Sequence, residues 1–416
     1  MNRGVRPAIA SPAGTLEKLE AAVRFGADEV YFGGKAHNLR SQSGNLSLDE
    51  IGRACDFCRE RGVRTTFLLN SFLHENDVGG ARAYIDEVRA FAFDAYMVSD
   101  PGMLMLLRDA GVETPVHLST QMSTLNHPAA RFWERQGVSR IVLAREVTLG
   151  EIRAIREHTG AELEVFVHGA LCVSYSGRCL LSRFLSGRDA NTGGCSHPCR
   201  WRYALVEEKR EGNHMEIVEH ARGTEILSSK DLCLIERIPE YVEAGVDAFK
   251  IEGRMKSLYY TANVTRVYRH AAEVAAGGGD YLAHLPRWIG ELDLVSHRPY
   301  TADLWNEFEG MRFDGVPYVR KTLFMGYATG PGEHPNEVRV KTHNPIRTGD
   351  EIEAIFPVLD GDAGGDFFSV MEINEEEKSV AMAQPGKVYL FKLDKAVRPD
   401  AVFRKRIEDD KEQARC

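Results

Sequence analysis

Short apolar runs alternate with longer amphipathic segments through the first two thirds of the chain. Eight runs rich in Val, Ile, Phe and Tyr are typical of buried strands, and they cover residues 7–13, 28–34, 64–71, 95–100, 115–120, 140–146, 164–170 and 248–254. Seven segments with helical periodicity predict helices, at residues 15–26, 47–62, 77–91, 101–111, 127–137, 148–160 and 232–245. Several of these helices end in Gly just before the next strand, as a left-handed helix cap requires.

This alternation predicts an α/β fold, and the number of strands favours one version of it. Eight strands, each followed by a helix, over about 275 residues fit a closed, parallel (β/α)8 barrel. A doubly wound open sheet is the main alternative, but the sequence lacks the Gly-rich dinucleotide fingerprint that often accompanies it. We therefore expect a TIM-like barrel over residues 1–275.

The repeating pattern is interrupted once and then ends. Residues 170–234 predict a small antiparallel insertion after the seventh strand. Residues 276–320 predict a linker with an irregular helical segment. From residue 321 onward, short strands separated by Gly, Pro and Asp predict a small β-barrel-like domain over 321–402, followed by a charged tail at 403–416.

The composition indicates where the protein is located more clearly than what it binds. The 416 residues are 43% apolar and 27% charged with a net charge of −9, so there is no overall attraction to nucleic acid. Two modest basic strips, 339–347 and 403–406, could still contact phosphates, although a solvated surface explains them equally well. No apolar run is long enough for a signal peptide or a membrane span, so we expect a cytoplasmic protein without a membrane partner.

Five of the eight cysteines lie within a window of 62 residues at the edges of the predicted insertion: Cys172, Cys179, Cys195, Cys199 and Cys233. In a (β/α)8 barrel the loops that follow the strands form the catalytic face, so these thiols are expected at the barrel mouth. A reducing cytoplasm favours metal ligands or catalytic groups over disulfides.

The spacing of these cysteines favours one kind of metal centre. Only the pair Cys195 and Cys199 resembles a zinc knuckle, whereas wide spacing with Gly and Ser between the ligands suits a four-thiolate iron–sulfur cluster. Inert buried thiols are the structural alternative. Cys55 and Cys58, by contrast, fall on the core-facing side of a predicted outer helix, and we expect them to pack there.

Polar residues also gather at the predicted strand ends: His117, Ser119, Gln121, Arg145, Glu146, His168, Lys250, Glu252 and Arg254. Among them His117, His168 and Glu252 are candidate acids or bases. Arg145, Lys250 and Arg254 are candidate cations for binding an anionic substrate. A purely structural role is an equal alternative for each, but together they favour an active site over a binding scaffold.

The stretch 164–182, "EVFVHGALCVSYSGRCLLS", resembles the signature of the collagenase-like peptidase family U32. The resemblance continues in "GCSHPCRWRY", "SSKDLC", "FKIEGRMKS" and "VSHRPYT", in the N-terminal "PAGTLEKLEAAVRFGADEVYFGG" and in the C-terminal "NPIRTGDEIEAIFP". It thus covers most of the chain. Members of this family are linked either to peptidase activity or to oxygen-independent hydroxylation of tRNA uridine, ribosomal RNA cytidine or a quinone precursor.

The resemblance implies a [4Fe-4S] cluster held by Cys172, Cys179, Cys195 and Cys233, with Cys199 as an alternative fourth ligand. It also implies a tRNA partner, because the tRNA-type members share the C-terminal domain that quinone-type members lack. For that branch the resemblance further implies prephenate as the hydroxyl donor. Two carboxylates on prephenate would suit the three candidate cations. A peptidase is less well supported, since neither H-E-x-x-H nor G-x-S-x-G occurs and Cys172 with His168 is the remaining pair.

Overall fold

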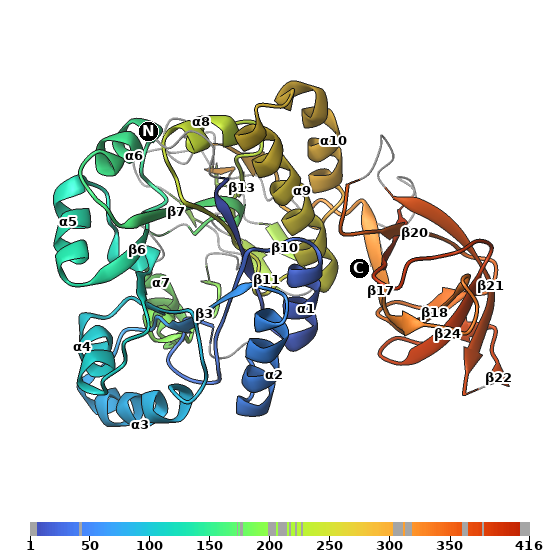
Figure 1. Cartoon of the computed structure of the whole chain (residues 1–416), viewed down its shortest axis with the longest axis horizontal. Helices are drawn as coiled ribbons and strands as arrows, with labels where there is room; N and C mark the ends of the chain where they lie inside the picture. The colour runs from blue at the N-terminus through green and yellow to red at the C-terminus, as the bar shows by residue number, and fades with distance from the viewer. Residues whose placement is uncertain are drawn as a thin grey trace.

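A computed structural model describes residues 6–40, 44–172, 174, 178–198, 205–206, 214–215, 218–220, 223–225, 228–302, 311–312, 318–359, 365–376 and 378–407. Its larger part is a ring of helices around a barrel, and its smaller part is a β domain at one side (Figure 1).

The predicted parallel barrel is confirmed. Its strands are β1 (Ala8–Pro12), β2 (Glu29–Phe32), β3 (Arg64–Leu69), β4 (Ala95–Val98), β5 (Val116–Leu118), β6 (Val138–Val142), β7 (Glu162–Ala170) and β14 (Ala248–Ile251). Each strand pairs in parallel with the next, and β14 pairs with both β7 and β1, which closes the barrel. Six of them lie within the apolar runs expected from the sequence, and β6 and β7 each begin two residues before the expected run.

The helices cover the outside of the barrel. They are α1 (Leu16–Arg24), α2 (Leu48–Arg59), α3 (Val78–Val88), α4 (Pro101–Asp109), α5 (His127–Arg135), α6 (Leu149–Arg156), α8 (Ile238–Glu243) and α9 (Leu258–Gly277). Side-chain caps fix several of their starts, as in the reciprocal capping boxes that Ser47 forms with Glu50 and Thr148 with Glu151. Cys55 and Cys58 lie on the buried face of α2, which confirms their expected place in the core.

The inside of the barrel has two layers of different character. Ala10, Tyr31, Leu68, Met97 and Val142 form an apolar cluster with Phe166. Two positions earlier on their strands lie the buried polar residues Glu29, Thr66, Arg140 and Glu164. Since side chains two apart on a strand face the same way, the polar layer lies below the apolar one, toward the amino-terminal ends of the strands.

The insertion after β7 contains the short helix α7 (Leu181–Ser186) and small antiparallel pairs. These are β8 (Leu205–Val206) with β9 (His214–Met215), β10 (Val218–His220) with β11 (Gly223–Glu225), and β12 (Ser228–Ser229) with β16 (Met311–Arg312). The chain returns through β13 (Asp231–Cys233), which pairs antiparallel with the end of β7 and parallel with β15 (Tyr300–Thr301).

The C-terminal domain is a closed antiparallel sheet in the order β20 (Glu351–Ile355), β25 (Val402–Arg406), β17 (Thr322–Pro331), β18 (Glu337–Thr342), β24 (Val388–Leu393) and β21 (Asp366–Glu375), with β21 pairing back to β20. Three two-residue strands flank it: β19 (Ile346–Arg347), β22 (Lys378–Ser379) and β23 (Met382–Ala383). Strand β25 extends to Arg406, so the start of the expected charged tail is part of this domain.

A 13-residue helix, α10 (Tyr281–Asp293), lies in the expected linker and packs with α9 between the barrel and the β domain (Figure 1). Within the described part of the chain, no helix combines the length and apolarity needed to cross a bilayer.

Candidate active site at the barrel mouth

The segment that follows β7 folds over the carboxyl-terminal end of the barrel. The backbone N–H of Phe72, after β3, donates to the carbonyl of Asn191 at 3.0 Å. Arg178 reaches the sulfur of Met122, after β5, at 3.6 Å and lies over the ring of Phe72. The cysteine-bearing segment therefore spans the mouth from β7 toward β3 and β5, as the sequence predicts.

Two of the cysteines are held by a local hydrogen-bond network. The Asn191 side chain accepts from the Cys179 backbone N–H at 3.3 Å and donates to the Cys179 carbonyl at 3.1 Å. Ser196, beside Cys195, bonds to the hydroxyls of Ser182 at 3.0 Å and Ser186 at 2.6 Å. Both segments are thus fixed before any ligand binds.

Cys172 and Cys233 approach from the other side of the mouth. Cys172 follows β7 directly, and Cys233 on β13 pairs in register with His168 on β7. Cys172, Cys179, Cys195 and Cys233 are all free thiols, whereas Cys199 lies outside the described residues. Cys172, Cys179 and Cys195 thus belong to the segment over the mouth, whereas Cys233 lies beside His168 on β13.

The described cysteines do not form a single-ion site. No three of their sulfurs lie within 4.8 Å of one another, as the ligands of one metal ion would. A four-iron cluster takes one thiolate on each iron, so its ligand sulfurs are spread more widely. Among the described residues, the cysteines therefore form no preassembled three-thiolate site for one ion.

His168 does not face into the mouth, because β7 contains a bulge. Lys250 on β14 pairs with Phe166, but the next residue, Ile251, pairs with His168, which leaves Val167 as the extra residue. Ile251 belongs to the outer core, so its partner His168 also points outward, away from the barrel axis.

The outward side of the bulge is a pocket of tyrosines. The His168 ring nitrogens lie 3.3 Å from the Tyr268 hydroxyl and 3.5 Å from the Tyr300 hydroxyl. Burial holds the pKa of His168 well below its usual value, so its imidazole is neutral. Cys233 shares this pocket, with its sulfur 3.7 Å from the Tyr268 hydroxyl, and burial raises the pKa of its thiol to about 11.

Arg145 and Glu252 do lie together at the mouth. The Arg145 guanidinium is 3.7 Å from the Glu252 carboxylate and 4.2 Å from the centre of the Phe166 ring. Its other contact is a long one, 3.4 Å to the carbonyl of Ala170. The Arg145 Nε is buried without a hydrogen-bond partner, so this cation has unused donor capacity.

Arg254 is 5% exposed and is held by the amide oxygens of Asn38, at 3.1 Å, and Asn45. Burial first, and nearby Arg40 second, lower the pKa of Arg254 to about 10. Each asparagine accepts one hydrogen bond from Arg254, and the buried Arg254 Nε has no partner among the described residues.

His117 lies below the mouth in the polar layer of the barrel, and Lys250 links this layer to the apolar one. Lys250 pairs in register with Ala10 and Phe166, and its Nζ lies 4.1 Å from the centre of the Tyr31 ring and 2.5 Å from the Glu164 carboxylate. Arg140 bridges Glu29 at 2.7 Å and Glu164 at 3.1 Å. Burial, followed by Arg140, lowers the pKa of His117 to about 4.

Three members of the polar layer have the spacing of a cation site. Ligand atoms of Glu29, His117 and Glu164 lie within 4.8 Å of one another, and all three residues are buried. However, Arg140 and Lys250 already balance the two carboxylates, so a divalent ion would add uncompensated buried charge. The sequence patterns did not single out the two glutamates or Arg140, because strands buried on both faces show no alternation to mark inward residues.

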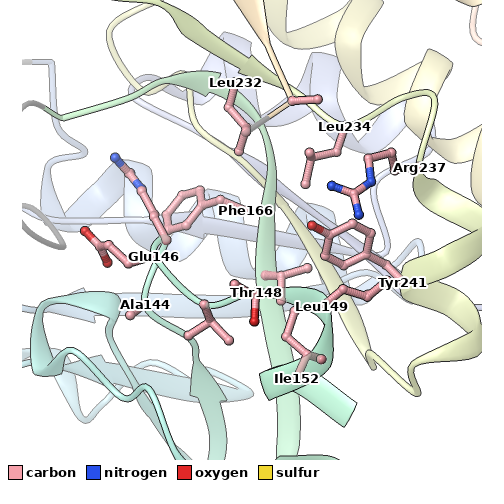
Figure 2. A pocket seen from close by; sticks show the side chains of 15 residues that line it. Ala144, Glu146, Thr148, Leu149, Ile152, Phe166, Leu232, Leu234, Arg237 and Tyr241 are labelled. Carbon is pink, nitrogen blue, oxygen red and sulfur yellow. The ribbon is translucent and has the colours of Figure 1, made fainter. Parts of the chain in front are cut away.

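A cavity of about 300 Å³ opens beside Arg145. Phe166, Leu232 and Leu234 form apolar walls, and Thr148 and Leu149 belong to the start of α6. Figure 2 shows Arg237 and Tyr241 across the cavity from Phe166. Arg237 was not a sequence candidate, since it precedes a helix rather than following a barrel strand.

Comparison with known proteins places this fold and its cysteines in one family. The model of peptidase family U32 matches residues 14–310, a range that contains every barrel strand after β1 and all five clustered cysteines. The chain belongs to peptidase family U32. The resemblance expected from the signature is therefore confirmed.

Individual U32 proteins match almost the whole chain. The tRNA hydroxylation protein P1 of Bacillus subtilis is 34% identical over 414 residues, covering 96% of this chain and 95% of that protein. The tRNA hydroxylation protein P of Escherichia coli is 31% identical with 92% coverage of each. A collagenase of Porphyromonas gingivalis is 31% identical, covering 95% and 97%. These matches include the C-terminal domain as well as the barrel.

Proposed function

We propose that this U32 protein is an oxygen-independent RNA hydroxylase that forms 5-hydroxyuridine at the wobble position of tRNA. The observation that carries the proposal is the match to tRNA hydroxylation proteins over nearly their full length. The clustered cysteines support the same reaction class, because in this proposal they provide ligands for a redox centre.

In this proposal the redox centre is a [4Fe-4S] cluster on Cys172, Cys179 and Cys195, with Cys233 or Cys199 as the fourth ligand. When bound, the cluster would supply electron transfer at the mouth. The chain's own residues would then bind and orient the substrates: Arg145 offers a cation and Glu252 a carboxylate beside it. Prephenate, an organic dianion, is the proposed hydroxyl donor, and the cytoplasm the proposed location.

A peptidase is the second candidate, and the collagenase relative favours it. Such an enzyme needs a base beside its nucleophile. Both ring nitrogens of His168 face tyrosine hydroxyls on the outer side of β7, so the one histidine expected to activate Cys172 is directed elsewhere. The geometry therefore supports hydroxylation better than thiol proteolysis.

The test uses a bacterial strain that lacks its own tRNA uridine hydroxylases, complemented with this chain. Nucleoside mass spectrometry of its tRNA should show restored 5-hydroxyuridine derivatives with the wild type and with Cys55→Ala. Cys172→Ala should restore none and should contain little iron after anaerobic purification. If hydroxycytidine in ribosomal RNA is restored instead, the substrate is ribosomal RNA and not tRNA. Full activity of an iron-free protein would contradict the proposal.

A further inference from the structure

The cavity beside Arg145 is separate from the axis of the barrel. Phe166 faces the barrel interior and Val165 the outer core, yet both line it, so the cavity passes over the edge of the barrel between β6, β7 and α8. Its volume, about 300 Å³, is at the lower end of the range for ligand pockets. It can hold a small molecule but not a folded RNA.

One end of the cavity is prepared for an anion. Arg145 stacks on Phe166, and among the described residues its polar contacts are long, at 3.4 Å and 3.7 Å, and its buried Nε has no partner. Helix α6 starts in the same wall, and its first amides at Leu149 and Gly150 have no partner within the helix. A carboxylate placed here would accept charge-assisted hydrogen bonds.

The rest of the cavity is suited to a carbon skeleton. Leu232, Leu234 and Ile152 give apolar surface. Arg237 and Tyr241 also line the cavity, across from Phe166 (Figure 2), but the Arg237 guanidinium donates to both carboxylate oxygens of Glu240 at 3.0 Å. Glu146 adds one carboxylate to the lining. The cavity thus offers donors at the Arg145 end and hydrocarbon beyond it, which matches a compact organic acid with a carboxylate at one end.

We infer that this cavity, rather than the centre of the barrel, binds the small organic acid that serves as hydroxyl donor, with Arg145 as its main carboxylate contact. The inference rests on the proposed function for the identity of that acid. In this arrangement the nucleobase would bind on the barrel axis, under the cysteine-bearing segment. Ala170, whose carbonyl accepts a hydrogen bond from Arg145, lies two residues before Cys172, so the cavity is next to the start of the cysteine-bearing segment.

Gly150 provides a steric test that leaves the contacts of Arg145 intact. A side chain built on Gly150 meets nothing within 4 Å, and the residue lines the cavity at the second position of α6. Gly150→Ala should therefore fold as well as the wild type, and Gly150→Phe should add a ring at the exposed rim of the cavity and narrow its entrance. Gly79→Phe is the matched control, since Gly79 is also an open helical glycine, on α3.

The experiment is calorimetric titration of the full-length protein with prephenate, with thermal melts to verify folding. Wild type, Gly150→Ala and Gly79→Phe should bind equally, whereas Gly150→Phe, with a ring at the rim of the cavity, should bind more weakly. Arg145→Met should bind about ten- to a hundredfold more weakly, as expected for the loss of hydrogen bonds to a charged group.

The outcomes separate the inference from the proposed function. Unchanged binding in Gly150→Phe, with tRNA hydroxylation intact in the complemented strain, would overturn the cavity assignment alone. Hydroxylation by a wild type that binds no prephenate would overturn both the cavity assignment and the proposed donor. Loss of 5-hydroxyuridine in Gly150→Phe but not in Gly79→Phe would support the cavity in cells.

Discussion

At the scale of single residues, burial separates the two predicted histidines from the chemistry of the mouth. His168 is neutral under α9, and His117 is neutral in the polar layer inside the barrel. Since both have a depressed pKa, each binds a proton more readily in the unfolded chain than in the folded one. They should therefore make the fold less stable in acid.

His117 gives this effect a defined pH range. Its pKa is about 4 in the folded protein against 6.5 as its ordinary value, so between these values the unfolded state binds more protons and stability falls as pH falls. The full contribution is about 3 kcal/mol. His117→Gln should make urea-unfolding free energies depend less on pH between 6.5 and 4, by about one proton.

Thr66→Val is the control for this measurement. It removes the 2.6 Å hydrogen bond to Glu29 in the same layer but no titratable group. It should lower stability at every pH and keep the wild-type slope. Equal slopes in wild type and His117→Gln would mean that His117 is already protonated, or solvated, in the folded protein.

At the scale of elements, the barrel could be predicted from the sequence and the direction of individual side chains could not. Apolar runs and helical periodicity place the strands, because burial on both faces is a property of the whole run. The bulge at Val167 shifts the pairing of β7 by one residue, and no apolar pattern encodes it. One signal was present: Gly169, at φ +109°, leaves no room for a Cβ against the Glu252 carbonyl.

Strand β25 is a second case in which the sequence does not show where a side chain points. The motif "FRKR" reads as a basic surface, but Arg404 is fully buried and contacts Glu291 on α10 at 2.7 Å and Glu353 on β20 at 2.5 Å. Sequence alone cannot place two acidic partners 113 and 51 residues away. This arginine therefore joins the domains instead of contacting RNA.

Arg404→Met should weaken that junction strongly. It leaves the two carboxylates buried with less compensation, for which about 3–5 kcal/mol is the usual cost. Lys341→Met removes a half-exposed pair with Glu17 across the same junction and should cost less than about 1 kcal/mol. Chemical denaturation and limited proteolysis near residue 320 measure both. Equal effects of the two substitutions would contradict a buried ionic junction.

At the scale of the whole molecule, the docked β domain carries exposed basic side chains beside the barrel. Arg339 on β18 and Lys392 on β24 are exposed on neighbouring, paired strands. Deleting the domain would also uncover Glu291 and Tyr259, so RNA binding is better tested by surface substitutions than by truncation.

The double variant Arg339→Gln with Lys392→Gln should bind tRNA more weakly without changing iron content or stability. If each side chain contacts one phosphate, the slope of log affinity against log salt should become shallower by about 2, because fewer counterions are released. Arg131→Gln with Arg135→Gln, on α5 at the far side of the barrel (Figure 1), is the matched control and should keep the wild-type slope. The measurement is the affinity of each variant for tRNA at several salt concentrations, from low to moderate. If both pairs have the same slope, the RNA approaches another face, and the β domain serves to brace α9 and α10 behind the tyrosine pocket.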